Sequence, residues 1–174
     1  GSATASAGAG HERLRALFTA SDDASLQRNP IEALFRGDLR HADRFGDYLS
    51  DAYFAAERRA AEQDLAALAR IDRTALGAAD RVSYDVFRYT RAMDLRSYEP
   101  SLLATTVVRP IDHFAGLQTW VPQVASGEGI APFTSAVDYD NNLKRLDGYI
   151  AQLDASIARM REGLAAGVVQ PKLV

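Results

Sequence analysis

Residues 138–164 read "DYDNNLKRLDGYIAQLDASIARMREGL", and this stretch decides the fold. Its large apolar residues follow one another at spacings of four and three, which is the repeat of one face of an α-helix. We predict a helix near 136–166, with Ser135 and Asp138 as a capping box and Gly167 as the C-terminal cap. Gly148 predicts a kink or break. The apolar positions are Tyr139, Leu143, Leu146, Ile150, Leu153, Ile157, Met160 and Leu164.

This apolar stripe has two interpretations. The first is that it packs against other helices inside one domain, so that its residues form part of the core. The second is a coiled-coil dimer, although the repeat covers only about four heptads. Packing inside one domain is the interpretation that the sequence favours.

Two further helices precede it. Ser50 is a suitable N-cap for a helix near 50–70, whose buried side we expect to include Tyr53, Phe54, Leu65 and Leu68. A second helix near 78–96 repeats the apolar spacing, and the short loop between the two predicts an antiparallel hairpin. The expected core positions of this second helix are Val82, Val86, Tyr89 and Met93.

The sequence therefore predicts an all-α fold, an antiparallel helical array with a long C-terminal helix. Leu14, Leu17 and Phe18 indicate a first helix, and Pro30 begins a short one. The region near 97–133 contains four prolines, at positions 100, 110, 122 and 132, and is expected to be an irregular loop with one helical turn or short strand.

Composition places the chain among ordinary globular domains. It has 174 residues, of which 47% are hydrophobic and 25% charged, and its formal net charge is −3. This balance gives no reason to expect a nucleic-acid partner, since such proteins usually carry a basic stripe. The chain has no cysteine, which excludes disulfides and thiolate metal sites.

The first ten residues, "GSATASAGAG", are small and polar. We expect residues 1–10 to be a disordered tag or linker and residues 11–174 to be one helical region. The segment resembles the spacer that follows a removed export or lipoprotein signal, which predicts a periplasmic or membrane-anchored location outside the cytoplasm. A plain linker on a cytoplasmic protein is the alternative.

Motifs that carry chemistry are mostly absent. "HERLR" at His11 begins like the zinc-protease motif H-E-x-x-H, but Arg15 stands where the second histidine is required. The other histidines, His41 and His113, have no partner at ligand spacing. There is also no G-x-S-x-G nucleophile elbow and no phosphate-binding P-loop. We therefore expect no catalytic residue, cofactor or metal site in this chain.

One segment carries the features of a recognition surface. Residues 109–123, "RPIDHFAGLQTWVPQ", place polar side chains beside the only tryptophan in an irregular region. The alternative is a loop that is held on the helices by Phe114 and Trp120, with its charges solvated. The candidate substrate-binding residues are Arg109, Asp112, His113, Gln118 and Trp120.

Four fragments in order and spacing resemble the N-terminal part of a large bacterial family, domain of unknown function 885. The resemblance extends over about residues 12–174. Its fragments are "RNPIEALFRGD", "LSDAYFAAE", "LARIDRTALGAADRVSYDVFR" and "DYDNNLKRLDGYIAQLDASIARMREGLAAGVVQPKLV".

The resemblance implies a longer, mostly helical protein that is often exported or lipid-anchored and looks like a zinc-dependent peptidase. The metal motif of that family lies far downstream of the matching part, so no catalytic residue can be transferred to this sequence. We expect the chain to be the N-terminal helical segment of such a peptide hydrolase, forming a wall of its substrate cleft. Its expected partners are the C-terminal catalytic half, which holds the zinc, and a peptide substrate.

The alternative is a stand-alone helical module that binds a partner through its long helix or through the 97–133 region. In the first case, the helices were shaped to pack against a catalytic half. An apolar face of the isolated chain would then be exposed, and the chain is expected to self-associate.

Overall fold

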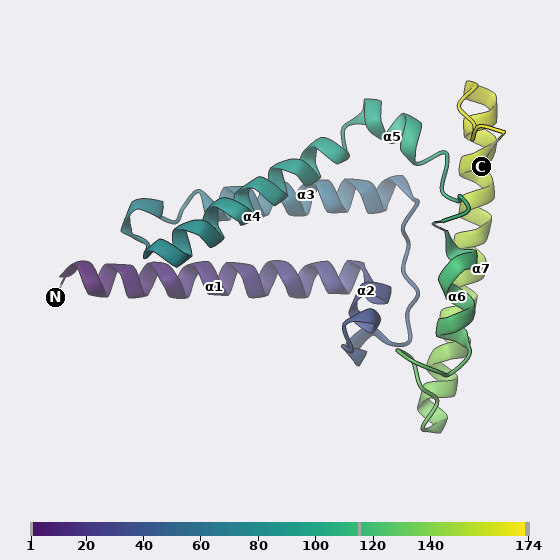
Figure 1. The fold of residues 1–174 in the computed structure, drawn as a ribbon, viewed down its shortest axis with the longest axis horizontal. Coiled ribbons are helices and arrows are strands. Elements are labelled where there is room, and N and C mark those ends of the chain that lie inside the picture. The colour runs from purple at the N-terminus through teal and green to yellow at the C-terminus, as the bar shows by residue number, and fades with distance from the viewer. Residues whose placement is uncertain (1, 115, 173–174) are drawn as a thin grey trace. The chain divides into compact units, whose positions relative to one another are not determined.

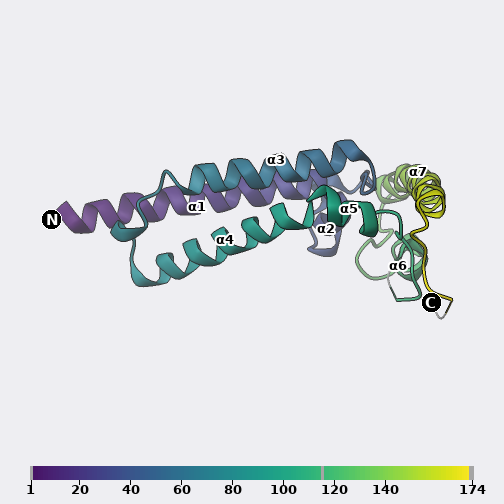
Figure 2. The same ribbon diagram turned by 90° about the horizontal axis from the view of Figure 1, so that it is seen from above.

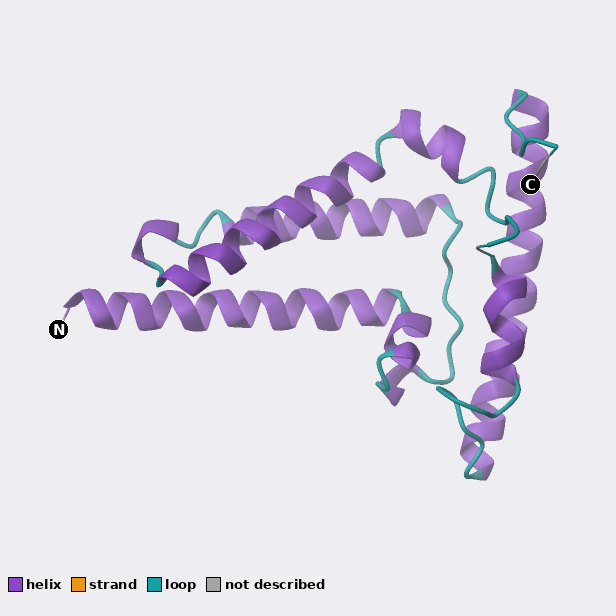
Figure 3. Ribbon diagram, viewed as in Figure 1, coloured by secondary structure: helices purple, strands orange, loops and turns teal. Residues whose placement is uncertain are grey.

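The computed structural model describes residues 2–114 and 116–172. They form seven α-helices and two 3-10 helices, with no strand in this described part (Figure 3). The predicted all-α class is confirmed. No helix of the described residues is both long and apolar enough to cross a membrane. Gly1 of the predicted linker and the last two residues of the C-terminal motif, Leu173 and Val174, lie outside the described residues.

The chain divides into two compact units. Unit 1 comprises Gly1–Ser25 and Phe54–Glu99, and unit 2 comprises Leu26–Tyr53 and Pro100–Val174. Each unit is thus assembled from two separate stretches of the chain. Two of the helices pass from one unit into the other.

Unit 1 contains most of α1 (Ser2–Arg28) and α3 (Asp51–Leu68), and all of η2 (Arg73–Ala75) and α4 (Ala78–Ser97). Figures 1 and 2 show α3 beside both α1 and α4, with the short η2 connection turning the chain back from α3 into α4. The predicted helices near 50–70 and 78–96, and the hairpin between them, are confirmed. Ser50 caps α3 as predicted, since its hydroxyl accepts the Tyr53 N–H at 3.0 Å.

Helix α1 differs from the expectation at its beginning. It begins at Ser2, whereas the sequence predicts no regular structure over residues 1–10. Four of residues 2–10 are alanines, which have the highest helix propensity, and these offset the cost of the two glycines among them.

The core of unit 1 lies where the hairpin turns. Leu14 of α1 and Leu68 of α3 are buried there with Tyr84 of α4. The rings of Phe18 and Phe87 pack at a tilt of 42°, with their centroids 4.8 Å apart. Beside this core, Nδ1 of His11 lies 2.9 Å from a carboxylate oxygen of Asp80. The remaining core positions are Ile71 and Leu76, with Leu17 partly buried against them.

The apolar stripe of α4 was assigned to the core wrongly. Val82, Val86 and Tyr89 are exposed by 59–67%, whereas Tyr84 and Phe87 face the rest of unit 1. This helix has two apolar faces. The face with the aromatic side chains of Tyr84 and Phe87 is the one that packs in the core of unit 1. Periodicity locates the stripes of a helix, but it does not determine which one the chain itself covers.

Unit 2 contains α2 (Pro30–Phe35), η1 (Leu39–His41), α5 (Pro100–Thr106), α6 (Leu117–Ala125) and α7 (Ala136–Ala166). Helix α6 packs along α7 (Figures 1 and 2). The region near 97–133, expected to hold one helical turn or short strand, therefore contains two helices. The prolines indicate irregular chain, and for Pro100 this interpretation is wrong. Pro100 occupies the first position of α5, where proline is compatible with a helix.

The ends of α7 are as predicted. Ser135 and Asp138 form a reciprocal capping box, and Gly167 closes the helix in the left-handed conformation, with φ of 72°. The helix continues through Gly148, where a kink or break was expected. Glycine is needed there for close approach, since an added Cβ would lie 2.5 Å from Cβ of Phe45.

The apolar stripe of α7 faces away from its own unit. Six of its eight residues, among them Leu143, Ile150 and Leu164, are exposed by 40–70%. The buried positions of the helix are instead Asn142, Arg145, Gln152, Ser156 and Gly163. The prediction that the stripe packs inside one domain is therefore wrong for the described chain, and the expectation of an exposed apolar face is confirmed.

Candidate functional site

Three long polar side chains of α7 explain why its polar face is turned inward. Arg145, Gln152 and Arg159 are each seven residues apart and so project from the same face at intervals of about two turns. All three bind backbone groups of the segment 42–49, which has little regular structure of its own. Buried backbone groups that lack a helix or sheet partner need such side chains.

The contacts follow the segment in order. Arg145 donates to the Ala42 carbonyl, Gln152 Oε1 accepts the Tyr48 N–H at 3.0 Å, and Arg159 donates twice to the Leu49 carbonyl, at 2.7 and 2.9 Å. The segment is thus held against α7 along about four turns.

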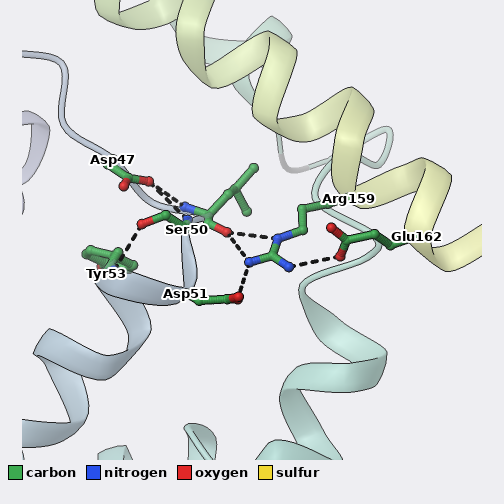
Figure 4. A network of polar contacts seen from close by, with 7 residues as sticks. Asp47, Ser50, Asp51, Tyr53, Arg159 and Glu162 are labelled. Atoms are coloured by element: carbon green, nitrogen blue, oxygen red, sulfur yellow. Dashed lines mark hydrogen bonds and ion pairs between the residues drawn. The ribbon is translucent and has the colours of Figure 1, made fainter.

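Figure 4 shows the last of these contacts. The Arg159 guanidinium also lies 2.5 Å from Asp51 and 2.9 Å from Glu162, and these carboxylates raise its pKa. Burial alone would raise the pKa of nearby Asp47. Hydrogen bonds from Ser50 and Leu49 and the charge of Arg159 lower this pKa by a larger amount, so that it lies below the usual value. The network therefore favours the ionised form of Asp47 just before the start of α3.

An aromatic cluster occupies the middle of unit 2. Phe45 is buried and stacks on Trp120 with ring centroids 5.6 Å apart and planes 9° from parallel. Tyr48 and Tyr149 approach the same phenyl ring at 6.2 and 5.8 Å. Burial raises the pKa of Tyr48 to about 12, so this phenol stays neutral near pH 7.

A cavity of about 470 Å³ opens beside this cluster, within unit 2. Ligand pockets commonly have volumes of ~300–1,000 Å³. The walls come from α2, the segment 42–49, the 110–120 region and α7. The lining residues are Asn29, Ile31, Glu32, Phe35, Tyr48, Leu49, Pro110, Gly116, Leu117, Trp120, Gln152 and Ser156.

Of the five predicted substrate-binding residues, only Trp120 lines this cavity. Arg109 and Gln118 are exposed and bind carbonyls of their own region, those of Thr105 and Asp112. Asp112 accepts the Phe114 N–H at 2.7 Å, and the His113 ring is exposed beside that of Phe114. The role of these four side chains in binding stays a prediction.

The residues that sequence reasoning missed come from other segments. Ile31 and Tyr48 lie far from Trp120 in sequence, and so do Gln152 and Ser156 of α7. The spacing of Gln152 and Ser156 by one turn was a signal, because polar residues on one face of a helix can line a site. Only the fold shows that this face is buried.

No group of three or more histidine, cysteine, aspartate or glutamate residues with a metal-binding arrangement occurs in residues 2–114 and 116–172. No catalytic role can be assigned to any described side chain on geometry alone. The arrangement is that of a binding site, with apolar walls and a few fixed polar groups.

Comparison with known proteins assigns the sequence to a family. No curated protein and no solved structure matches it significantly. The bacterial family described as "Bacterial protein of unknown function (DUF885)" matches residues 30–174, which include all of the lining residues except Asn29. Because this match covers more than half of the chain, the chain belongs to the DUF885 family.

Proposed function

We propose that this chain is the helical N-terminal segment of a metal-dependent peptide hydrolase and forms a wall of the substrate cleft. The observation that carries the proposal is the cavity of unit 2, whose mostly apolar walls suit a peptide side chain. Membership of the DUF885 family is consistent with it. In this proposal the chain recognises substrate, and zinc is held by residues outside this sequence.

The exposed stripe of α7 supports a partner in the same protein. Its heptad spacing continues over Tyr139–Leu164 with no polar interruption, which is the pattern of a helix that packs against another helix. One edge of the stripe is acidic, with Asp140, Asp147 and Asp154 seven residues apart. We propose that the catalytic half covers this stripe with an apolar surface that has basic residues at its edge. The proposed location, the periplasm or the outer side of a membrane, stays a prediction of the sequence.

The test uses the protein encoded by the whole reading frame that contains these residues. Loaded with zinc, it should hydrolyse peptides, and a chelator should abolish the activity reversibly. Trp120→Ala should raise KM about tenfold or more with a smaller change in kcat, because the tryptophan binds the substrate away from the reacting atoms.

Phe114→Ala is the matched control, since Phe114 is an aromatic of the same region, is 84% exposed and does not line the cavity. It should leave KM unchanged. Absence of peptide hydrolysis by the zinc-loaded protein would contradict the proposed activity, and a Trp120→Ala variant with wild-type KM would contradict the cleft wall.

The second candidate function is a stand-alone module that binds a helical partner. The exposed stripes of α4 and α7 favour it, because each could receive an amphipathic helix. An absence of peptide hydrolysis, combined with a loss of partner binding on substitution of the α7 stripe, would support this function over the hydrolase.

A further inference from the structure

We propose that the cavity of unit 2 binds an organic cation, namely a protonated amine carried on an apolar or aromatic group. The cation lies beside Glu32 and against the aromatic rings of the lining, and the apolar group lies among the aliphatic side chains. The site is that of the proposed function, but the class of ligand is argued from the cavity alone. A peptide with a free amino terminus and a small amine both carry this chemistry, and the test distinguishes them.

The charge of the lining favours a cation. Glu32 is the only acidic or basic side chain among the described lining residues, and it is exposed, so that a ligand can reach its carboxylate. The pKa of Tyr48, another lining residue, is raised mainly by burial and further by the charge of Glu32, which places this charge close to the cavity wall. Arg44 also acts on Tyr48, but it does not line the cavity and donates to the Gln27 carbonyl at 3.0 Å. An amine is therefore attracted to the lining, and a carboxylate or phosphate is repelled.

The aromatic side chains of the same lining are a second feature that suits a cation. Phe35, Tyr48 and Trp120 all line the cavity. The ring planes of Phe35 and Trp120 are 67° apart and their centroids 6.0 Å apart, so the two rings form adjoining walls and not a parallel stack. The face of an aromatic ring attracts a cation within about 6 Å of its centroid, and groups of such rings recognise ammonium ligands.

Most of the neutral polar groups of the lining serve the structure itself. The Tyr48 hydroxyl donates to the Phe45 carbonyl at 2.9 Å and accepts the Ile31 N–H at 3.2 Å. The Ser156 hydroxyl donates to the Gln152 main-chain carbonyl at 2.8 Å. Gln152 Oε1 accepts the Tyr48 N–H at 3.0 Å, and its Nε2 is buried. Recognition is thus left to the carboxylate and the rings.

The aliphatic walls receive the apolar part of the ligand. They are formed by Ile31, Leu49, Pro110 and Leu117. The cavity volume of about 470 Å³ is large enough for a phenyl ring or a branched aliphatic group together with an ammonium group. Burial of this apolar group supplies affinity, and the charge supplies selectivity.

The 174-residue chain itself is the material for the test. Trp120 is its only tryptophan and lines the cavity, so intrinsic fluorescence reports binding there. The probes are phenethylamine, phenethyl alcohol and phenylacetate, which share a phenyl group and differ in charge. Near neutral pH we expect saturable binding of the amine, about tenfold tighter than that of the alcohol, and the weakest binding for phenylacetate.

Glu32→Gln is the matched variant, because it removes the charge and keeps the size of the side chain. It should lower the preference for the amine over the alcohol to about threefold or less and leave binding of the alcohol unchanged. Glu128→Gln, at an exposed residue of unit 2 outside the lining, is the control and should keep the wild-type preference. Phe35→Leu keeps the wall apolar but removes one ring, and it should also lower the preference. Circular dichroism checks that the variants fold.

A further pair of probes distinguishes the two sources of the amine. Phenylalanyl-glycinamide has a free amino terminus, which is protonated at about pH 6, and its N-acetyl form has none. Tighter binding of the free peptide than of phenethylamine, lost on acetylation, would identify a peptide amino terminus as the ligand. Weaker binding of the peptide than of phenethylamine would identify a small amine.

Equal affinities of the wild-type chain for phenethylamine and phenethyl alcohol would overturn the proposal, as would tighter binding of phenylacetate or an absence of saturable binding. These comparisons need no variant, so a misfolded variant leaves the test intact. Binding of the amine without hydrolysis by the complete protein would contradict only the proposed function. Hydrolysis without binding of the amine by this chain would contradict only this inference.

Discussion

Helix α7 has two faces that differ by one residue in register. The outward face consists of apolar residues such as Leu143, Ile150 and Ile157, and the inward face consists of their preceding neighbours, Asn142, Tyr149 and Ser156. Both repeat at spacings of three and four, and they are about 100° apart around the helix. The chain buries the more polar of the two.

The two faces show that the hydrogen-bonding needs of a neighbouring segment, and not hydropathy alone, decide which side of a helix is buried. The inward face meets a segment whose backbone groups need donors and acceptors, and Arg145, Gln152 and Arg159 supply them. The outward face is largely exposed, and the only ring contact among the described residues that involves it is that of Tyr139 with Phe133, at 4.6 Å. An amphipathic helix can therefore turn its polar side toward its own unit and leave its apolar side exposed.

The largest expected effect is on the inward face at Gly148. Gly148→Ala should lower the free energy of unfolding by about 1–3 kcal/mol, because the added Cβ would meet Phe45 at 2.5 Å. Urea denaturation followed by Trp120 fluorescence measures this, since Trp120 stacks on Phe45. Gly8→Ala in α1 is the control, because its added Cβ would meet nothing within 4 Å. It should raise the free energy of unfolding by up to ~1 kcal/mol, since alanine has the higher helix propensity. An unchanged midpoint for Gly148→Ala would mean that α7 does not approach Phe45.

The next effect concerns the backbone contacts of the inward face. Arg159→Lys should lower the free energy of unfolding by about 1–2 kcal/mol, because an ammonium cannot donate to Leu49, Asp51 and Glu162 in the same planar geometry. Thermal unfolding measures the change. Arg58→Lys, in the exposed pair with Glu62, should change stability by less than ~0.5 kcal/mol. Equal effects of the two substitutions would mean that the network of Figure 4 adds nothing to stability.

On the outward face the expected change in stability is small and the change in association is large. Ile150→Lys combined with Ile157→Lys should alter the free energy of unfolding of the monomer by less than ~1 kcal/mol, since both residues are exposed. Sedimentation should show that the self-association expected of the wild-type chain is lost.

Ala151→Lys with Ala158→Lys is the control for these two charges. It adds them at exposed positions one residue further along, beside the stripe. This control should still self-associate. If the Ile150 and Ile157 double variant unfolds instead, the stripe belongs to the core.

The smallest expected effect is the pH response of the α7 N-cap. Hydrogen bonds from Thr134 and Ser135 lower the pKa of Asp138. A depressed folded-state pKa adds stability above the unfolded value, and this contribution is lost as the pH falls through the folded value. Asp138→Asn should therefore be less stable than wild type near neutral pH, and the difference should narrow below about pH 4.

Melting temperatures across this pH range measure the response. Asp140→Asn, two residues further along α7, is the control outside the capping box and should show little difference from wild type at any pH. A difference in melting temperature between Asp138→Asn and wild type that increases as the pH falls would contradict the assignment of the capping box.

The helices themselves were predictable from local features. The bounds of α3, α4 and α7 follow from apolar spacing, from Ser50 and Ser135 as N-caps and from Gly167 as C-cap, all of which act within a few residues of the chain. The start of α1 and the helices α5 and α6 were missed, because alanine-rich segments and a proline at the first position of a helix have weak or ambiguous local signals.

Of the candidate site, the sequence located only Trp120. The segment 109–123 gathers polar and aromatic residues, but the cavity is completed by Ile31, Tyr48 and Gln152, which are separated from it by long stretches of chain. No local pattern carries that information.

The sequence by itself determined the all-α class, the long C-terminal helix with its caps, and the DUF885 family, because spacing, caps and ordered motifs are properties of neighbouring residues. Only the tertiary structure decided which stripe of α4 and of α7 is covered, and which distant residues enclose the cavity. A helix of given sequence has the same faces in any environment. Whether a face is core or surface depends on what other segments place against it, and that choice is made by the summed packing and hydrogen bonding of the whole unit.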